Sequence, residues 1–160
     1  MLWNFPVPAS PMPWSNVCGE IMNAAAPDEV IYRVPAEIPP DEAAALYVEA
    51  GWMETPDTET VATMLKGSFA VSAAFHQGRL IGFMRAFSDG VSDAYLLDLV
   101  VHAPFRKHGT GRQILRNLTD YLKQRGIDWV LCIGAPGTEK FYSRTDAGAM
   151  NGYTPYRFPT

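Results

Sequence analysis

The feature that most constrains the fold is a glycine turn, Arg106-x-x-Gly109-x-Gly111, between an apolar strand pattern over 95–101 and a helix pattern. In the helix pattern, apolar residues recur with helical spacing on one wide face. These residues are Ile114, Leu115, Leu118, Tyr121 and Leu122. The order predicts a long helix whose N-terminus lies directly beside the end of a buried strand.

Such a turn can bind an anion. The amides of residues 107–112 precede the first helical hydrogen bonds and point out of the helix N-terminus, where the helix dipole is positive. Arg106, Lys107 and Arg112 add charge around them. A nucleotide-hydrolase loop would need a lysine and then Ser or Thr after the second glycine, and a dinucleotide fingerprint would need a glycine at Ile114. Both of these phosphate motifs are therefore excluded.

The remaining patterns predict an α/β domain with a mixed sheet. Strands are expected at 30–34, 68–76, 79–87, 95–101, 128–133 and 153–158, and helices at 39–50, 55–66, 136–144 and from the glycine turn to residue 125. This order, β-α-α-β-β-β-α-β-α-β, predicts helices on both faces of the sheet. One domain is expected over 28–160, after an N-terminal arm over 1–27 that is rich in proline and aromatic residues.

The chain resembles the GNAT superfamily of acetyl-CoA-dependent N-acetyltransferases. Residues 99–111, with Leu115 four positions beyond, fit the family signature Gln/Arg-x-x-Gly-x-Gly/Ala after an apolar strand. The predicted element order is similar to the GNAT fold over 28–160. Residues 46–52, 82–90 and 94–99 look like a bacterial and plant-chloroplast branch of the family, whose members acetylate arylalkylamines or protein amines.

This resemblance implies that acetyl-CoA is the co-substrate and that its acetyl group passes to a primary amine by direct attack. In the family, the pantetheine arm pairs with the strand backbone before the motif, here Leu99, Val100 and Val101, and the pyrophosphate lies on the turn. The implied turn residues are Arg106, Lys107, His108, Gly109, Thr110, Gly111 and Arg112. The alternative from another class is an acyl-CoA-binding regulatory or partner module without turnover.

Asp98 is the candidate base. A primary amine has a pKa near ~10 and must lose a proton before it attacks, and Asp98 is the only charged residue within 95–101. The alternative is a structural carboxylate that caps a neighbouring loop. Strand alternation places Asp98 on the face of Leu96 and Val100, and a β-bulge would move it to the other face.

Tyr142 is the candidate acid. Phe141-Tyr142 resembles the family motif Phe-Tyr-x-x-x-Gly-Phe, whose tyrosine meets the CoA sulfur, so Tyr142 is expected to protonate the departing thiolate. The alternative is a core tyrosine. The expected glycine–aromatic pair comes late, as Gly152-Tyr153, after a longer loop.

The acceptor side is implied to include the loop between the first two helices, at 51–57. Trp52 can stack on an aromatic ring or cover a cation. Glu54, Asp57 and Glu59 beside Trp52 favour a cation with an apolar body, an arylalkylamine-like or lysine-like acceptor. Tyr95 is expected to line the acceptor site with Trp52 and Glu54. Residues 1–60 hold ten acidic side chains and one basic side chain, whereas 61–160 hold seven acidic and twelve basic. The acidic half suits a cationic ligand, and the alternative is an ordinary solvated face.

Composition limits the other partners. The three histidines form no ligand pair on one face, so no metal is expected. We expect no nucleic-acid partner and no membrane partner. No apolar stretch approaches the ~18 residues of a membrane span, and the N-terminus has no basic residue before Arg33, which favours a cytoplasmic enzyme. The aromatic residues of the arm either close the acceptor pocket or contact a second subunit of a homodimer, and the sequence leaves both open.

Overall fold

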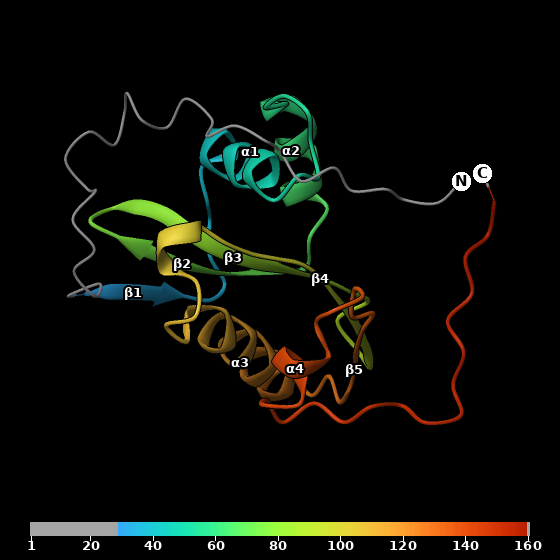
Figure 1. Ribbon diagram of the computed structural model, residues 1–160. Helices are drawn as coiled ribbons and strands as arrows, with labels where there is room; N and C mark the ends of the chain where they lie inside the picture. Colours follow the sequence, from blue (N-terminus) through green and yellow to red (C-terminus); the bar gives the residue numbers. More distant parts are fainter. Residues whose placement is uncertain (1–28, 160) are drawn as a thin grey trace.

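The computed structural model of the chain describes residues 29–159 (Figure 1), so the arm predicted over 1–27 lies outside the described residues. A five-stranded mixed sheet forms its centre. The elements, in order, are β1 (Val30–Arg33), α1 (Pro40–Glu49), α2 (Thr58–Lys66), β2 (Ala70–His76), β3 (Arg79–Ser88), β4 (Asp93–Val101), the 3-10 turn η2 (Ala103–Phe105), α3 (Thr110–Gln124), β5 (Trp129–Cys132) and α4 (Glu139–Tyr142).

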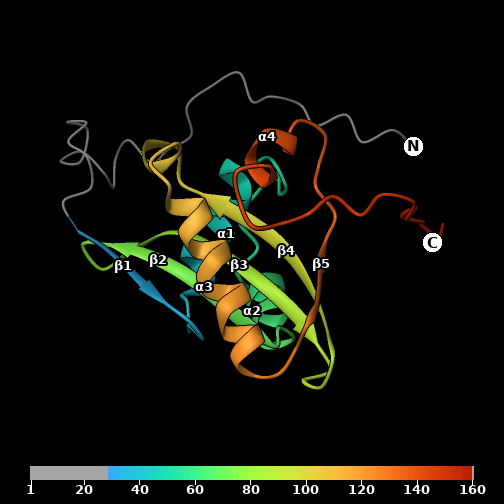
Figure 2. The ribbon, with the colours of Figure 1, turned by 90° about the horizontal axis from the view of Figure 1, so that it is seen from below.

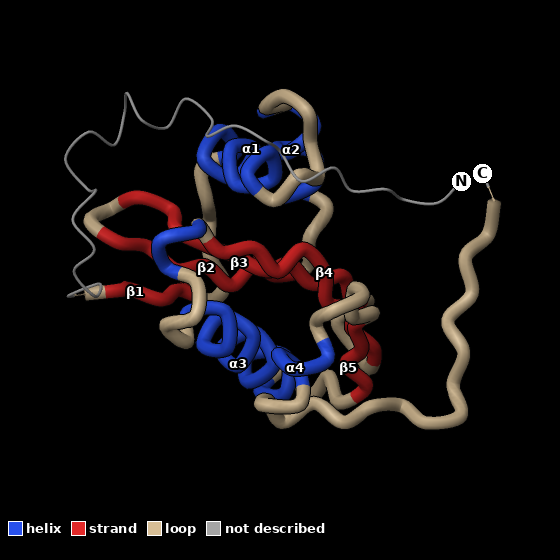
Figure 3. Tube along the Cα trace, viewed as in Figure 1, coloured by secondary structure: helices blue, strands red, loops and turns tan. Residues whose placement is uncertain are grey.

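The strands lie in the order β1-β2-β3-β4-β5. Neighbours are antiparallel except β4 and β5, which are parallel. Helices α1 and α2 cover one face of the sheet, and α3 lies diagonally across the other (Figures 2 and 3). Each face has its own core cluster of buried apolar side chains. The α/β fold class and the layer order predicted from the sequence are confirmed.

Local sequence explains where the helices begin and what they bury. Helix α2 is capped by Asp57, whose carboxylate accepts a hydrogen bond from the Thr60 amide. Along α3, the side chains of Ile114, Leu118 and Leu122 are fully buried against the sheet. Burial of such a stripe contributes ~1.5–3 kcal/mol for each large apolar side chain, which fixes α3, and with it the glycine turn, on the sheet. Within 29–159, no helix is long and apolar enough to cross a membrane.

The C-terminal strand predicted at 153–158 is a correction. This part of the described chain is extended coil that runs away from the sheet (Figure 1). Tyr153, Tyr156 and Phe158 are 67%, 81% and 82% exposed. Pro155 also removes one ladder donor. The aromatic residues of 153–158 favoured a strand, but a strand needs hydrogen-bonding partners on a neighbouring edge. Here the Tyr153 ring lies 6.5 Å from that of Trp129, at the start of β5, and the segment joins no sheet of the described residues.

Candidate active site

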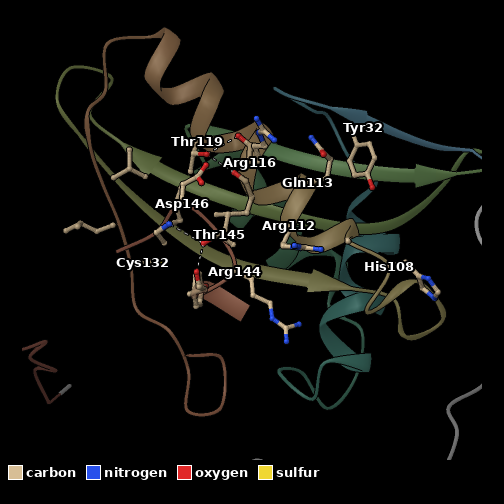
Figure 4. A pocket seen from close by; sticks show the side chains of 17 residues that line it. Tyr32, His108, Arg112, Gln113, Arg116, Thr119, Cys132, Arg144, Thr145 and Asp146 are labelled. Atoms are coloured by element: carbon tan, nitrogen blue, oxygen red, sulfur yellow. Dashed lines mark hydrogen bonds between the residues drawn. The ribbon is translucent and has the colours of Figure 1, made fainter. Parts of the chain in front are cut away.

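A pocket of about 840 Å³ lies between α3 and the segment that follows β5 (Figure 4). At one end it is bounded by the glycine turn and at the other by β5 and α4. Its lining is Tyr32, Leu96, His108, Gly109, Arg112, Gln113, Leu115, Arg116, Thr119, Val130, Leu131, Cys132, Tyr142, Arg144, Thr145, Asp146 and Ala147. The pocket therefore connects the turn predicted to bind phosphate with the tyrosine predicted to act as an acid.

The glycine turn has the geometry of an anion site. Gly109 is the N-cap of α3 and has a φ of 89°, a left-handed value that glycine adopts without strain. The Gln113 amide donates to the Gly109 carbonyl at 3.0 Å, so the amides of residues 110–112 belong to the first turn and have no carbonyl partner within the helix. The positive side chains of Arg112, Arg116 and Arg144 line the pocket beside them. This donor and charge set fits a diphosphate.

Gly111 faces a narrow space between α3, β4 and α4. A Cβ atom built there would lie 3.6 Å from the Phe141 ring, 3.6 Å from Val101 and 3.9 Å from Leu99. A methyl group would make ordinary contacts at these distances, whereas a longer side chain would fill the space. Leu99 and Val101, predicted to hold the pantetheine arm, thus lie next to the turn, while Val100 is buried on the opposite face, against α1 and α2.

Arg106, predicted at the phosphate rim, is bonded to the end of β4 and to α1. Its Nε donates to the Val101 carbonyl at 2.7 Å, and its Nη2 donates to Glu49 Oε1 at 2.8 Å. Glu49 also accepts the Ala103 amide at 2.7 Å and lies 2.5 Å from His102 Nδ1. This Glu49 cluster joins the end of α1 to the end of β4. Of the three cations predicted at the phosphate rim, Lys107 is exposed to solvent and Arg112 lines the pocket.

The Glu49 cluster predicts an acid-sensitive contact. Burial raises the pKa of the Glu49 carboxyl, but the hydrogen bond and charge of His102, the Ala103 amide and the charge of Arg106 outweigh burial and hold the pKa below its usual range. A carboxyl with a lowered pKa stabilises the fold above its unfolded-state pKa, and this stability is lost as the pH falls through the folded-state pKa.

We expect Glu49→Gln to lower the free energy of unfolding by about 1–2 kcal/mol at pH 7, and the difference from wild type to shrink between about pH 5 and about pH 3. Urea unfolding of both proteins across this pH range measures the difference in unfolding free energy. Glu37→Gln, at an exposed position before α1, is the control and should leave the pH dependence as it is. A constant difference between Glu49→Gln and wild type at every pH would contradict the role of the carboxylate charge.

Tyr142 lies at the inner end of the pocket. It packs against the core cluster beneath α3, and its ring meets the Phe141 ring edge-on at 5.1 Å. Burial raises the pKa of the Tyr142 hydroxyl to about 12, and the neighbouring Cys132 thiol and Tyr95 add to this effect. Cys132 makes the last pair between β4 and β5, with Leu96. The hydroxyl of Tyr142 is thus a protonated donor at neutral pH, close to the point where the pairing of β4 and β5 ends.

Asp98 lies at a β-bulge in β4. The register between β3 and β4 shifts so that Phe83 pairs with Val100 and Arg85 with Leu97. The bulge turns Asp98 toward α1, whereas Leu96 remains in the core beneath α3. The sequence left two faces open for Asp98, that of Leu96 by simple alternation and the opposite one by a β-bulge. The structure has the bulge, because one extra residue in the strand reverses the alternation.

The Asp98 carboxylate is bonded through Oδ2. This oxygen accepts hydrogen bonds from the Tyr47 hydroxyl at 2.8 Å, from Arg85 Nε at 2.8 Å and from Arg85 Nη2 at 2.5 Å. Burial raises the pKa of the Tyr47 hydroxyl well above its usual range, and the Asp98 charge adds to the shift. The role of Asp98 as a base stays a prediction, and these contacts give the carboxylate a second role to test.

The acceptor-side residues lie on the α1–α2 face. Trp52 is 43% exposed, and its ring centroid lies 5.8 Å from that of Tyr47, the residue bonded to Asp98. Glu54 is exposed two residues beyond Trp52. Tyr95 is 39% exposed and pairs with Phe87, which is 42% exposed. Trp52 is thus connected to Asp98 through Tyr47, and Tyr95 forms an exposed aromatic pair with Phe87.

Sequence reasoning assigned no site role to Arg85 or Tyr47. Arg85 is 2% exposed in a strand that is otherwise almost wholly apolar. Arg79 is exposed at the first position of β3, so Arg85 is the one charged residue in the strand interior at 80–87. A charge inside an apolar strand also selected Asp98, and two such charges of opposite sign on neighbouring strands predict a pair. Across residues 29–159, no three His, Cys, Asp or Glu side chains are grouped to hold a metal ion.

The model of the Acetyltransferase (GNAT) family matches residues 32–144, which is most of the described domain. The chain belongs to this family. The match runs from β1 through the glycine turn to the end of α4, so it includes the pocket, the bulge and Tyr142.

Curated relatives and solved structures agree with this membership. The chain is 29% identical over 98 residues to an uncharacterized N-acetyltransferase, ycf52, of Pyropia yezoensis, covering 59% of this chain and 56% of that protein. It is 31% identical over 90 residues to serotonin N-acetyltransferase 2, chloroplastic, of rice (54% and 45%), and 27% identical over 127 residues to histone acetyltransferase TAP1 of Glycine max (72% and 54%). The chain thus spans less than two thirds of each of these relatives.

Two crystal structures share the fold. An aminoglycoside acetyltransferase from an uncultured soil sample, solved with sisomicin, superposes with a TM-score of 0.66 at 16% identity over 82% of this chain and 96% of its own. A ribosomal-protein-alanine N-acetyltransferase from Brucella melitensis biovar Abortus superposes with a TM-score of 0.65 at 18% identity over 82% and 100%. At these identities the likeness concerns the fold alone.

Proposed function

We propose that this domain transfers the acetyl group of acetyl-CoA to a primary amine, with direct attack of the amine on the thioester. The observation that carries the proposal is the pocket that joins the first turn of α3 to the Tyr142 hydroxyl. Family membership supports the same reaction class.

The glycine turn would hold the coenzyme. The amides of residues 110–112 and the side chains of His108, Arg112 and Arg144 would bind its phosphates, and Leu99 and Val101 would line the path of its arm. When bound, acetyl-CoA supplies an activated acyl group. Holding two reactants in the reactive geometry can lower the activation barrier by ~7–11 kcal/mol. Positioning the thioester is therefore the main role that we propose for these residues.

Tyr142 would donate the proton that the thiolate needs on leaving. Its hydroxyl is protonated at neutral pH and lies beside Cys132, where the pairing of β4 and β5 ends. Asp98 stays the predicted base, with Oδ1 as the oxygen that could accept a proton, since Oδ2 already accepts three hydrogen bonds. The cytoplasmic location and the homodimer also stay predictions.

The acceptor class follows from the aromatic and acidic surface at Trp52, Glu54 and Tyr95. A body that stacks on Trp52 and carries a positive amine fits it, which describes arylalkylamines and lysine side chains. The names of the rice and soybean relatives are those of these two acceptor classes, serotonin and histone. We infer that the acceptor is a cationic amine with an apolar body.

Release of free CoA thiol in the presence of acetyl-CoA and a panel of amines tests the reaction. The panel contains arylalkylamines, a lysine peptide, a peptide with a free N-terminus and an aminoglycoside. Turnover with the arylalkylamine or the lysine peptide is expected. CoA binding without turnover on any amine would favour the module without catalysis, and the absence of CoA binding would contradict the proposal as a whole.

Trp52→Ala is expected to raise the KM for the acceptor about 2–30-fold, because cation–π and stacking contacts contribute ~0.5–2 kcal/mol. The KM of the wild type should also rise with ionic strength, because salt screens the acidic residues that attract the amine. Trp129→Ala is the matched control, since Trp129 is 47% exposed but lies at the start of β5. Preference for an anionic acceptor, or a KM indifferent to both Trp52 and salt, would contradict the acceptor assignment.

A further inference from the structure

Asp98, which is partly buried, forms a polar cluster with the buried side chains of Tyr47 and Arg85. Asp98 accepts hydrogen bonds from Tyr47 of α1 and from two nitrogens of Arg85 of β3. Arg85 Nη1 also donates to the Met64 carbonyl at 2.8 Å and to Ser68 Oγ at 3.2 Å. This Asp98 cluster, defined as Tyr47, Arg85 and Asp98, ties α1, the end of α2, β3 and β4 together on one face of the sheet (Figure 3).

The backbone of Asp98 is in an uncommon conformation. Its φ is 59°, in the left-handed region that residues with a side chain rarely adopt. With ordinary strand dihedrals, alternation would point the side chain toward α3 and away from Arg85. The bulge and the ion pair therefore depend on each other: the carboxylate reaches the guanidinium only from the bulged backbone, and the ion pair favours that backbone.

The bulge lies where the coenzyme arm is expected to bind. The pairing of β4 with β5 ends at Leu96 and Cys132, two residues before Asp98. Leu99 and Val101 follow directly and face the space beside Gly111. A bulge at Asp98 sets the direction of this stretch, because an extra residue bends the strand and increases its twist. Its conformation thus decides how the backbone at 99–101 is presented beside the gap between β4 and β5.

We propose that the Asp98 cluster is a positioning device, which holds the bulge of β4 so that the backbone at 99–101 is aligned to bind the coenzyme arm. Asp98 then acts through backbone geometry, as a positioning residue. The proposal rests on the proposed function, since it concerns the coenzyme site of the same reaction. It predicts that coenzyme affinity depends on how readily residue 98 adopts the left-handed backbone conformation. A role in proton transfer alone predicts no such dependence.

The test compares three substitutions of Asp98 by the Kd for CoA, measured by calorimetry on the full chain. Asp98→Asn keeps the shape and tolerates a left-handed backbone, Asp98→Gly adopts that backbone freely without a side chain, and Asp98→Ala does neither. We expect the weakest binding for Ala, at about tenfold above the Kd of Gly, with Asn nearest to wild type. Tyr47→Phe, which removes one donor and keeps the ring, should weaken binding about two- to threefold.

Amide hydrogen exchange of residues 97–101 without CoA checks the bulge itself. Exchange should be faster in Asp98→Ala than in Asp98→Asn, and Asp93→Asn, at the exposed start of β4, should match wild type. If Asp98→Ala does not fold, Asp98→Asn and Tyr47→Phe still test the positioning role. Both variants should remain folded and have a higher Kd for CoA than the wild type.

The outcomes separate the two proposals. Equal CoA affinity in wild type, Asn and Phe variants would overturn the positioning role alone. Equal weakening by Gly and Ala would also overturn it, because backbone preference would then be irrelevant. A normal CoA Kd in Asp98→Asn, with loss of the acidic limb of kcat/KM, would instead assign Asp98 as the base. If the wild type does not bind CoA, the proposed function fails, and the positioning role fails with it.

Discussion

Gly111→Leu should abolish the thermal stabilisation that CoA gives to the wild-type domain. Ligand at about a hundredfold excess over its Kd adds ~2.7 kcal/mol to stability, a rise in Tm of about 5–10 °C for a chain of this size. The space beside Gly111 is bounded by Val101 and Leu99 on one side and by the Phe141 ring on the other. A leucine side chain would fill this space, which Leu99 and Val101 border and which the coenzyme arm is predicted to use.

Gly111→Ala is the matched control for this experiment. Its methyl group would lie 3.6 Å from its nearest neighbours, an ordinary contact distance, so most of the CoA-induced rise in Tm should remain. Differential scanning fluorimetry with and without CoA gives both the intrinsic Tm and the rise. If Gly111→Leu lowers the intrinsic Tm but keeps the full rise, the coenzyme does not use this space and the assignment of the turn is wrong.

Local patterns carried the parts of the fold that sequence predicted well. The turn at Gly109 and the helix behind it depend on residues close together in the chain: two glycines, then a stripe of apolar side chains at helical spacing. The helix predicted over 55–66 and the strands predicted at 68–76, 79–87 and 95–101 are equally local. Such features need no knowledge of distant partners, and the structure confirms them with shifts of one to three residues at most ends.

The features that the sequence did not predict depend on contacts between residues far apart in the chain. The sequence assigned Arg106 to phosphate, which stays a prediction, but it gave no sign of the ion pair with Glu49, 57 positions away. The face of Asp98 depended on a bulge whose stabilising partner, Arg85, is on another strand. The predicted last strand had the right residue types, but Tyr156 found no partner edge. In each case the local sequence pattern is present, but a contact with a residue distant in the chain, or the lack of one, determines the structure that forms.

Tyr142→Phe should lower kcat about 10²–10⁴-fold, the range typical of a positioned acid or base, with little change in the Kd for CoA. The ring would keep its edge-on contact with Phe141 and its place in the core, so the substitution removes only the hydroxyl. Burial raises the pKa of that hydroxyl to about 12. The wild type should therefore show no loss of kcat from this group as the pH rises to about 10, because the phenol remains protonated.

Tyr121→Phe is the control, because Tyr121 lies on α3 with its ring beneath Arg125, and kcat should stay near the wild-type value. Single-turnover measurements of acetyl transfer, together with the Kd for CoA, separate the chemical step from binding. A variant with normal kcat and the wild-type pH profile would assign Tyr142 to packing alone. An interaction made only as the thiolate departs affects turnover and leaves coenzyme affinity unchanged. A Tyr142→Phe variant with weak CoA binding and normal kcat at saturation would therefore show that the hydroxyl binds the coenzyme and does not act as the acid.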